Sequence, residues 1–94
     1  MGARLIATRP PDGETAAPGA AVVAVLAIEG AWSPESVRVW LDGAEATGRF
    51  AIRTDRAWPP RRAEVVLTGV EAGQHVAELR WQDGGRASWR FAVA

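Results

Sequence analysis

The chain has 94 residues, of which 48% are hydrophobic and 23% are charged, a composition that fits one folded domain spanning residues 1–94. Eleven basic residues balance eleven acidic ones, so no net positive field favours nucleic acid as a partner. The lack of cysteine excludes disulfides, thiolate metal sites and cysteine nucleophiles.

Glycine- and proline-containing turns interrupt the chain about every eight to twelve residues, with short apolar runs between them, as is typical of an all-β sandwich or barrel. We expect residues 1–8 to be either a linker or the first edge strand. Seven strands are predicted, at residues 3–8, 20–29, 36–41, 45–53, 63–68, 74–82 and 86–93.

Three of these strands alternate between apolar and polar side chains, which predicts one buried and one solvent-facing side. In the third strand Arg38 and Trp40 face outward, and in the sixth Glu78 and Arg80 do. The inward residues of the sixth and seventh strands are His75, Ala77, Leu79, Trp81, Trp89, Phe91 and Val93.

The longest apolar run, at residues 20–28, is far shorter than the ~20 residues that a membrane-spanning helix needs. No apolar segment follows Arg4, so the amino end does not predict a secretory signal. The residues alone therefore leave the compartment of the protein undetermined.

Several short motifs resemble those of bacterial immunoglobulin-like modules, the repeats of surface and secreted proteins. These motifs are Pro10-Pro11-Asp12-Gly13, the segment 33–43 that ends in Leu-Asp-Gly, the turn at 70–75 that ends in Gly-Gln-His, and Trp89-Arg90-Phe91-Ala92-Val93. The resemblance covers roughly residues 8–94. It implies an immunoglobulin-like sandwich of about seven antiparallel strands.

The same resemblance implies a non-catalytic structural or protein-interaction module, in a surface or secreted assembly, whose partners are proteins or neighbouring modules. A weaker resemblance runs to copper-resistance sandwich proteins. Their metal site needs several histidines and this chain has only His75, so we expect no copper site.

Catalytic and metal-binding arrangements find little support in the sequence. His75 is expected to form local hydrogen bonds, and Ser33, Ser36 and Ser88 lack the Gly-x-Ser-x-Gly context of a nucleophile. The carboxylates Asp42, Asp55 and Asp83 are interpreted as solvated turn residues and not as calcium ligands, because no dense acidic loop surrounds them. We expect no enzymatic activity, cofactor or metal.

Two surfaces remain candidates for binding. Alternation places Trp40 on one outer face, and the predicted interaction residues are Trp40, Arg38, Arg80, Arg90 and Trp58. Two alternatives stay open. One is a carbohydrate-binding module that uses exposed tryptophans, and the other is a small cytosolic protein that binds an anionic partner through the arginine-rich segment from Arg49 to Arg62.

Overall fold

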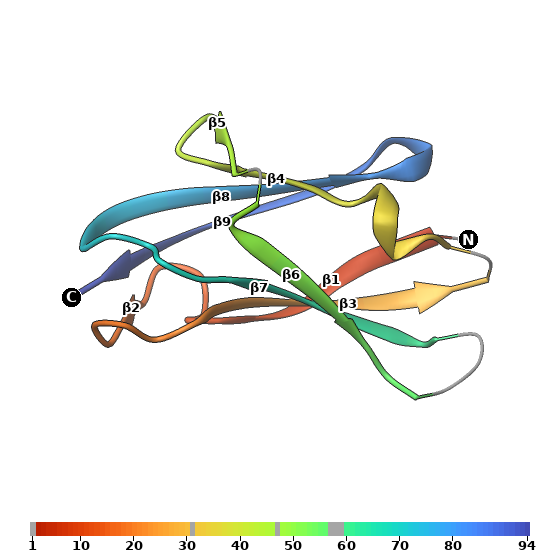
Figure 1. Ribbon diagram of the computed structural model, residues 1–94, viewed down its shortest axis with the longest axis horizontal. Helices are drawn as coiled ribbons and strands as arrows, with labels where there is room; N and C mark the ends of the chain where they lie inside the picture. The colour runs from red at the N-terminus through yellow and green to blue at the C-terminus, as the bar shows by residue number, and fades with distance from the viewer. Residues whose placement is uncertain (1, 31, 47, 57–59) are drawn as a thin grey trace.

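The computed structural model describes residues 2–30, 32–46, 48–56 and 60–94, and its described part is almost entirely β (Figure 1). Trp58, one of the predicted interaction residues, lies outside these residues. Within them the strands are β1 (Gly2–Arg9), β2 (Thr15–Ala16), β3 (Val22–Glu29), β4 (Arg38–Leu41), β5 (Ala44–Glu45), β6 (Phe50–Thr54), β7 (Arg62–Leu67), β8 (Gly73–Trp81) and β9 (Gly85–Val93).

The strands form two sheets that stack face to face. One sheet has four strands in the order β1-β3-β7-β6, and the other has five in the order β2-β9-β8-β4-β5. All neighbouring strands are antiparallel except β2 and β9, which run parallel. The fold is an immunoglobulin-like β-sandwich, as the sequence predicted.

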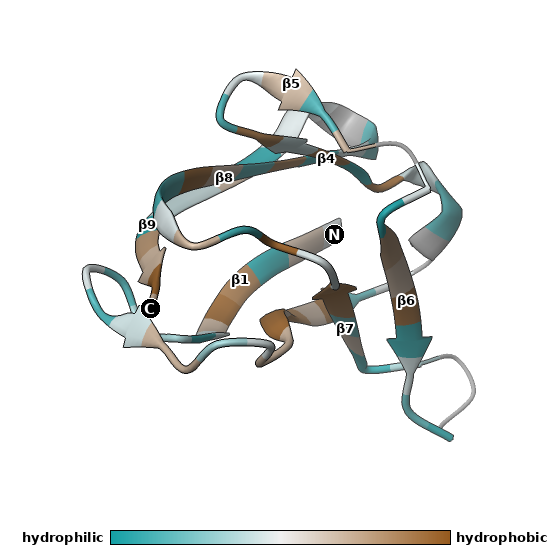
Figure 2. Ribbon diagram, turned by 60° about the vertical axis from the view of Figure 1, so that its left-hand side comes forward, coloured by the Kyte–Doolittle hydropathy of each residue, from teal (hydrophilic) through white to brown (hydrophobic). Residues whose placement is uncertain are grey.

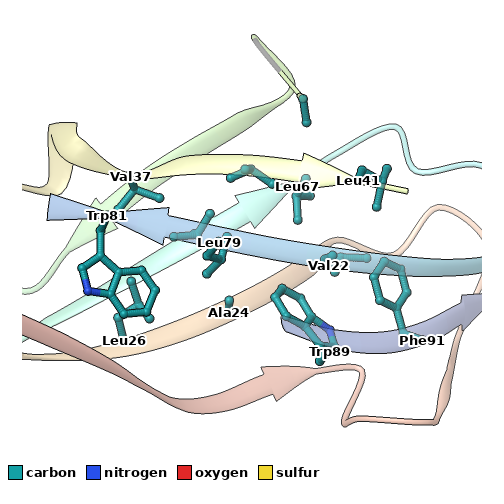
Figure 3. Close-up of a cluster of buried hydrophobic side chains, with 14 of the residues drawn as sticks. Val22, Ala24, Leu26, Val37, Leu41, Leu67, Leu79, Trp81, Trp89 and Phe91 are labelled. Carbon is teal, nitrogen blue, oxygen red and sulfur yellow. The ribbon is translucent and has the colours of Figure 1, made fainter. Parts of the chain in front are cut away.

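The core fills the space between the sheets and is built from the inward faces of both (Figure 3). The predicted inward parity of β8 and β9 is confirmed, since Leu79 is fully buried and Trp81 and Trp89 are 8% and 4% exposed. The opposite sheet contributes aliphatic side chains from β3 and β7, whose inward positions are Val22, Ala24, Leu26, Val65 and Leu67. Burial of this apolar surface supplies the main driving force for folding.

The prediction of one continuous strand at 45–53 is wrong. Its first part is β5, which pairs with β4, and its second part is β6, which pairs with β7 in the other sheet. Asp42 and Gly43 both have positive φ, at 54° and 84°, which closes a tight β4–β5 hairpin. Gly48, with φ of 76°, then lies in the segment that crosses to the four-stranded sheet.

The strand expected at 36–41 begins later, because residues 34–36 form a short 3-10 turn before β4. Among the described residues, no helix is long and apolar enough to cross a membrane.

Candidate functional site

The outer face of the five-stranded sheet carries the predicted interaction residues. As expected, β4, β8 and β9 share this sheet and β8 lies between the other two. Trp40 pairs in register with Glu78, which in turn pairs with Ser88. Because paired residues project to the same side of a sheet, Trp40, Glu78 and Ser88 form one row across this face.

Trp40 is half-buried and holds an arginine against its ring. The Arg80 guanidinium carbon lies 4.3 Å from the centre of the indole, which is cation–π geometry. Arg80 Nη2 donates to Glu78 Oε1 at 3.0 Å, and Arg86 Nη2 donates to the other carboxylate oxygen at 2.6 Å. These bonds from Arg86 and Arg80 lower the pKa of Glu78, so the carboxylate stays ionised and orients both guanidinium groups.

The remaining predicted arginines lie at opposite ends of this face. Arg38 turns back on its own segment and donates to the carbonyls of Glu35 and Val37 at 2.9 and 3.0 Å. Arg90 lies across from Val76 in the β8–β9 ladder, and its guanidinium makes no hydrogen bond or ion pair with a described residue. The structure therefore brings Arg80 onto Trp40 and leaves Arg38 and Arg90 apart from the stack.

Sequence reasoning missed two members of this surface, Arg86 and Val76. Both have the outward parity already assigned to Glu78 and Arg90, so the alternation contained the signal. Val76 is 44% exposed, an unusual value for a large aliphatic side chain in the middle of a strand. We name the outward group Trp40, Val76, Glu78, Arg80, Arg86 and Arg90 the Trp40 face.

Beside the Trp40 face is a hollow of about 410 Å³. Arg90, Gln74 and Thr15 lie along it, and the paired side chains of Asp42 and His75 form one wall. The hollow extends the outer face toward the β1–β2 connection, where the amide of Arg90 donates to Asp12 Oδ1 at 2.9 Å. The hollow thus shares Val76 and Arg90 with the Trp40 face, whereas Trp40 and Arg80 do not line it.

His75 bridges two segments through both of its ring nitrogens. Nδ1 lies 2.6 Å from Asp42 Oδ2, and Nε2 lies 2.6 Å from the Glu71 carbonyl oxygen. A carbonyl and an ionised carboxylate can only accept hydrogen bonds, so both ring nitrogens donate and the imidazole is protonated in this arrangement. The half-buried His75 makes the local hydrogen bonds that the sequence predicted, within a longer network.

Asp42 ties the β4–β5 turn to β8. Its other carboxylate oxygen accepts from the Val76 amide at 2.8 Å, and its own amide donates to the Val76 carbonyl at 2.8 Å. The Leu41-Asp42-Gly43 motif and the Gly73-Gln74-His75 motif, far apart in sequence, therefore meet through Asp42 and His75. Beyond the two motifs themselves, no sequence pattern indicates this pairing.

The pair shifts the pKa values of both partners. The hydrogen bond to Asp42 raises the pKa of His75 above its ordinary 6.5, and burial only partly opposes it. For Asp42, burial raises the pKa, but the bonds from His75 and the Val76 amide outweigh it and the pKa falls below 3.8.

We expect the pair to make stability depend on pH. The stability that protonated His75 contributes is complete below pH 6.5 and is lost as the pH rises through its higher pKa in the folded state. The stability that ionised Asp42 contributes is lost in acid, as the pH falls below 3.8. The free energy of unfolding from urea titrations should therefore fall from pH 6 to pH 9. His75→Gln should flatten that slope. Because the chain has a single histidine, NMR titration of its ring protons reads the pKa directly, and a value below 6.5 would contradict the network.

Among the described residues, no group of three or more His, Asp or Glu side chains is placed to hold a metal ion. Asp42 is engaged with His75, and Asp55 accepts from the Arg61 amide at 3.2 Å. The side chain of Asp83 lies outside the described part of the chain.

The arginine-rich segment does not gather into one surface among its described residues. Arg49 donates to the Gly69 carbonyl at 2.7 Å, whereas Arg53 and Arg62 lie on the outer face of the four-stranded sheet.

The chain matches solved structures by fold. CopC from Methylosinus trichosporium OB3b superposes with a TM-score of 0.64 at 17% identity, over 97% of this chain and 92% of that one. PcoC, a methionine-rich copper resistance protein from Escherichia coli, gives 0.53 at 13% identity over all of both chains. Domains 4 and 5 of the S-layer protein SbsC give 0.53 at 14%, over 98% of this chain and 46% of that one. No family model and no curated sequence matches the chain.

Proposed function

We propose that this immunoglobulin-like chain is a non-catalytic module that binds a protein partner through the Trp40 face. The observation that carries the proposal is the Arg80 guanidinium stacked on the half-buried Trp40 ring, next to a 44% exposed Val76. Tryptophan and arginine dominate the binding energy of protein interfaces, and an exposed aliphatic side chain adds apolar contact area. A surface or secreted assembly of such modules is the setting we propose.

The charges of this face favour an acidic partner. Arg80, Arg86 and Arg90 stand against two carboxylates, those of Glu78 and of Glu45, the β5 residue that pairs with Trp40. The Glu78 bonds hold two of these guanidinium groups in place before binding, which reduces the side-chain entropy lost in a complex. Planar, pre-oriented guanidinium groups are suited to bidentate contacts with Asp and Glu side chains.

The carbohydrate alternative is less well supported. A sugar ring stacks on an open aromatic face, whereas Arg80 lies over the ring of Trp40. The alternative based on residues 49–62 is weakened because Arg49 is engaged with the Gly69 carbonyl and the described arginines of that segment do not form one patch.

Site-specific photo-cross-linking tests the proposal. A benzophenone amino acid replaces Ser88, which lies in the row of Trp40, or Thr68, an exposed control position in the β7–β8 connection. In cells that produce the protein, we expect a discrete protein adduct from position 88 and none from 68. Arg80→Gln in the same background should abolish the adduct and lower the melting temperature by only about 2–8 °C, because an exposed cation–π contact contributes only about 0.5–1 kcal/mol.

Two results would contradict the proposal. One is equal adducts from both positions, and the other is an adduct at 88 that survives Arg80→Gln and Trp40→Ala. Calorimetry of the purified chain against a panel of polysaccharides tests the carbohydrate alternative. Polysaccharide binding that is lost in Trp40→Ala would establish that alternative in place of a protein partner.

A further inference from the structure

The hollow of about 410 Å³ on the outer face of the five-stranded sheet lies where the strands carry small side chains. In one row across three strands, Ala92 of β9 lies between Gln74 of β8 and Thr15 of β2. In the next row the amide of Gly13 donates to the Arg90 carbonyl, so the neighbour of Arg90 on that side has no side chain. A Cβ built on Gly13 meets no atom of the described residues within 4 Å. Space is therefore left above Ala92 and Gly13, between longer side chains.

Arg90 brings a positive charge to this hollow. Its backbone is fixed, because its amide donates to Asp12 Oδ1 at 2.9 Å and its carbonyl accepts from the β1–β2 connection. Its guanidinium is exposed and makes no hydrogen bond or ion pair with a described residue. Arg80 and Arg86, in contrast, are both bound to Glu78. Among the described residues of the Trp40 face, Arg90 is therefore the guanidinium left to pair with an incoming anion.

The acidic group on the wall of the hollow is already neutralised. Asp42 Oδ2 lies 2.6 Å from His75 Nδ1, and this hydrogen bond raises the pKa of His75 above its ordinary 6.5. At pH 6 the imidazolium balances the carboxylate, and the lining residues keep a single net positive charge, that of Arg90. A monoanion matches that charge, whereas a dianion such as a phosphate would also be repelled by the Asp42 carboxylate.

The other lining groups suit a carboxylate on a short aliphatic stem. A guanidinium fork matches the two oxygens of a carboxylate. The Thr15 hydroxyl and the Gln74 carboxamide supply further hydrogen-bond donors, and Val76, which is 44% exposed, and Ala92 offer apolar contact to the stem. Figure 2 shows the end of β9, marked C, beside a largely teal loop, which is the β1–β2 connection that bonds to it. The hollow is thus a cationic site with a polar rim.

We infer that this hollow is a carboxylate-binding site, in which Arg90 pairs with an acidic group of the protein partner. The inference rests on the proposed function for the identity of the partner, because the hollow shares Val76 and Arg90 with the Trp40 face. Its volume is within the roughly 300–1,000 Å³ of small-ligand sites, enough for one residue of a peptide. The carboxylate comes from a side chain or from the C-terminus of the partner, since both present the same two oxygens to Arg90.

Peptide titration followed by NMR tests the site without the natural partner. The probe is acetyl-Ala-Glu-Ala-amide, whose one charge is a side-chain carboxylate, and acetyl-Ala-Gln-Ala-amide is its neutral counterpart. At pH 6 we expect saturable shifts of the Val76, Arg90 and Ala92 amides, with a millimolar dissociation constant, from the glutamate peptide and none from the glutamine peptide. Acetyl-Ala-Ala-Ala with a free carboxyl end is the third probe. Whichever charged peptide binds more tightly identifies the source of the carboxylate.

Two variants should each weaken binding of the glutamate peptide at least tenfold. Arg90→Gln removes the charge, and Ala92→Leu fills the hollow without changing its charge. Arg53→Gln is the matched control, because Arg53 is also an exposed arginine in a strand but belongs to the other sheet, and it should leave binding unchanged. Near-UV circular dichroism checks that all three variants keep the fold.

Equal shifts from the glutamate and glutamine peptides would overturn the inference, and so would full affinity in Arg90→Gln or no binding of either charged peptide. These outcomes are separate from the test of the proposed function. An Arg80-dependent adduct at position 88 without peptide binding would leave the protein partner in place and remove the hollow from its interface. Peptide binding without any adduct would support the carboxylate site and count against the proposed function.

Discussion

Leu79→Ala should lower the free energy of unfolding by about 2–5 kcal/mol, the usual cost of a cavity left by a fully buried leucine. Leu79 is completely buried on β8, the central strand of its sheet, and its β4 partner Val39 is completely buried as well. Neighbouring strands on both sides restrict how far the core can collapse into the space, which favours the upper part of that range.

Chemical denaturation with tryptophan fluorescence measures this loss. Val76→Ala is the control on the same strand, since its side chain faces solvent and truncation there should change stability by less than about 0.5 kcal/mol. Equal losses at the two positions would mean that the inward and outward sides of β8 are misassigned.

Gly85→Ala should destabilise the protein by about 1–3 kcal/mol or more, because a side chain at this position overpacks the core. A Cβ built on Gly85 overlaps the indole of Trp81, directly across the β8–β9 hairpin. Trp81 is 8% exposed and packs with the core, so the ring has little room to move away. Gly85 has an ordinary φ of −67°, which makes the effect one of space and not of backbone strain.

A double-mutant cycle separates these causes. In a Trp81→Leu background the overlapping ring is gone, so Gly85→Ala should lower the free energy of unfolding by less than about 0.5 kcal/mol. The difference between its effects in the two backgrounds is the coupling energy, which is typical of residues in contact. Gly84→Ala should show no such coupling to Trp81, because Gly84 has φ of 76° and open space around its Cα. Additive losses for Gly85 and Trp81 would argue against the overlap.

The β8–β9 hairpin shows which structural features can be predicted from the sequence and which cannot. Alternation predicted the buried and exposed sides of both strands, because a two-residue period is a local property. Asp83-Gly84-Gly85 predicted a turn that needs positive φ, and Gly84 supplies it. Glycine is required at position 85 because a tryptophan across the ladder fills the space that a side chain would take. Local backbone preferences do not encode this contact.

The candidate site likewise has features that the sequence predicted and features that it did not. The outward position of Trp40 and its shared face with Arg80 followed from strand parity and order. The Asp42–His75 bond joins residues 33 positions apart and depends on the exact register between a turn and a strand. The change of sheet between β5 and β6 also escaped prediction, since Ala46 and Phe50 are as apolar as residues within a strand.

The parallel pairing of β2 with β9 contributes to how the molecule responds to tension. The two chain ends lie at opposite ends of its long axis (Figure 1), so pulling on Gly2 and Ala94 draws β2 and β9 in opposite directions along their length. The bonds between the two segments lie across that direction, from Gly13 to Arg90 at 2.7 Å, from Ala92 to Glu14 at 3.0 Å and from Ala94 to Ala16 at 2.9 Å. Such a force loads all of them in shear at the same moment, whereas peeling a hairpin apart breaks its bonds one by one. One of the shortest strands in the sandwich therefore adds mechanical resistance along the chain axis to that of the β1–β3 ladder, which begins at Gly2.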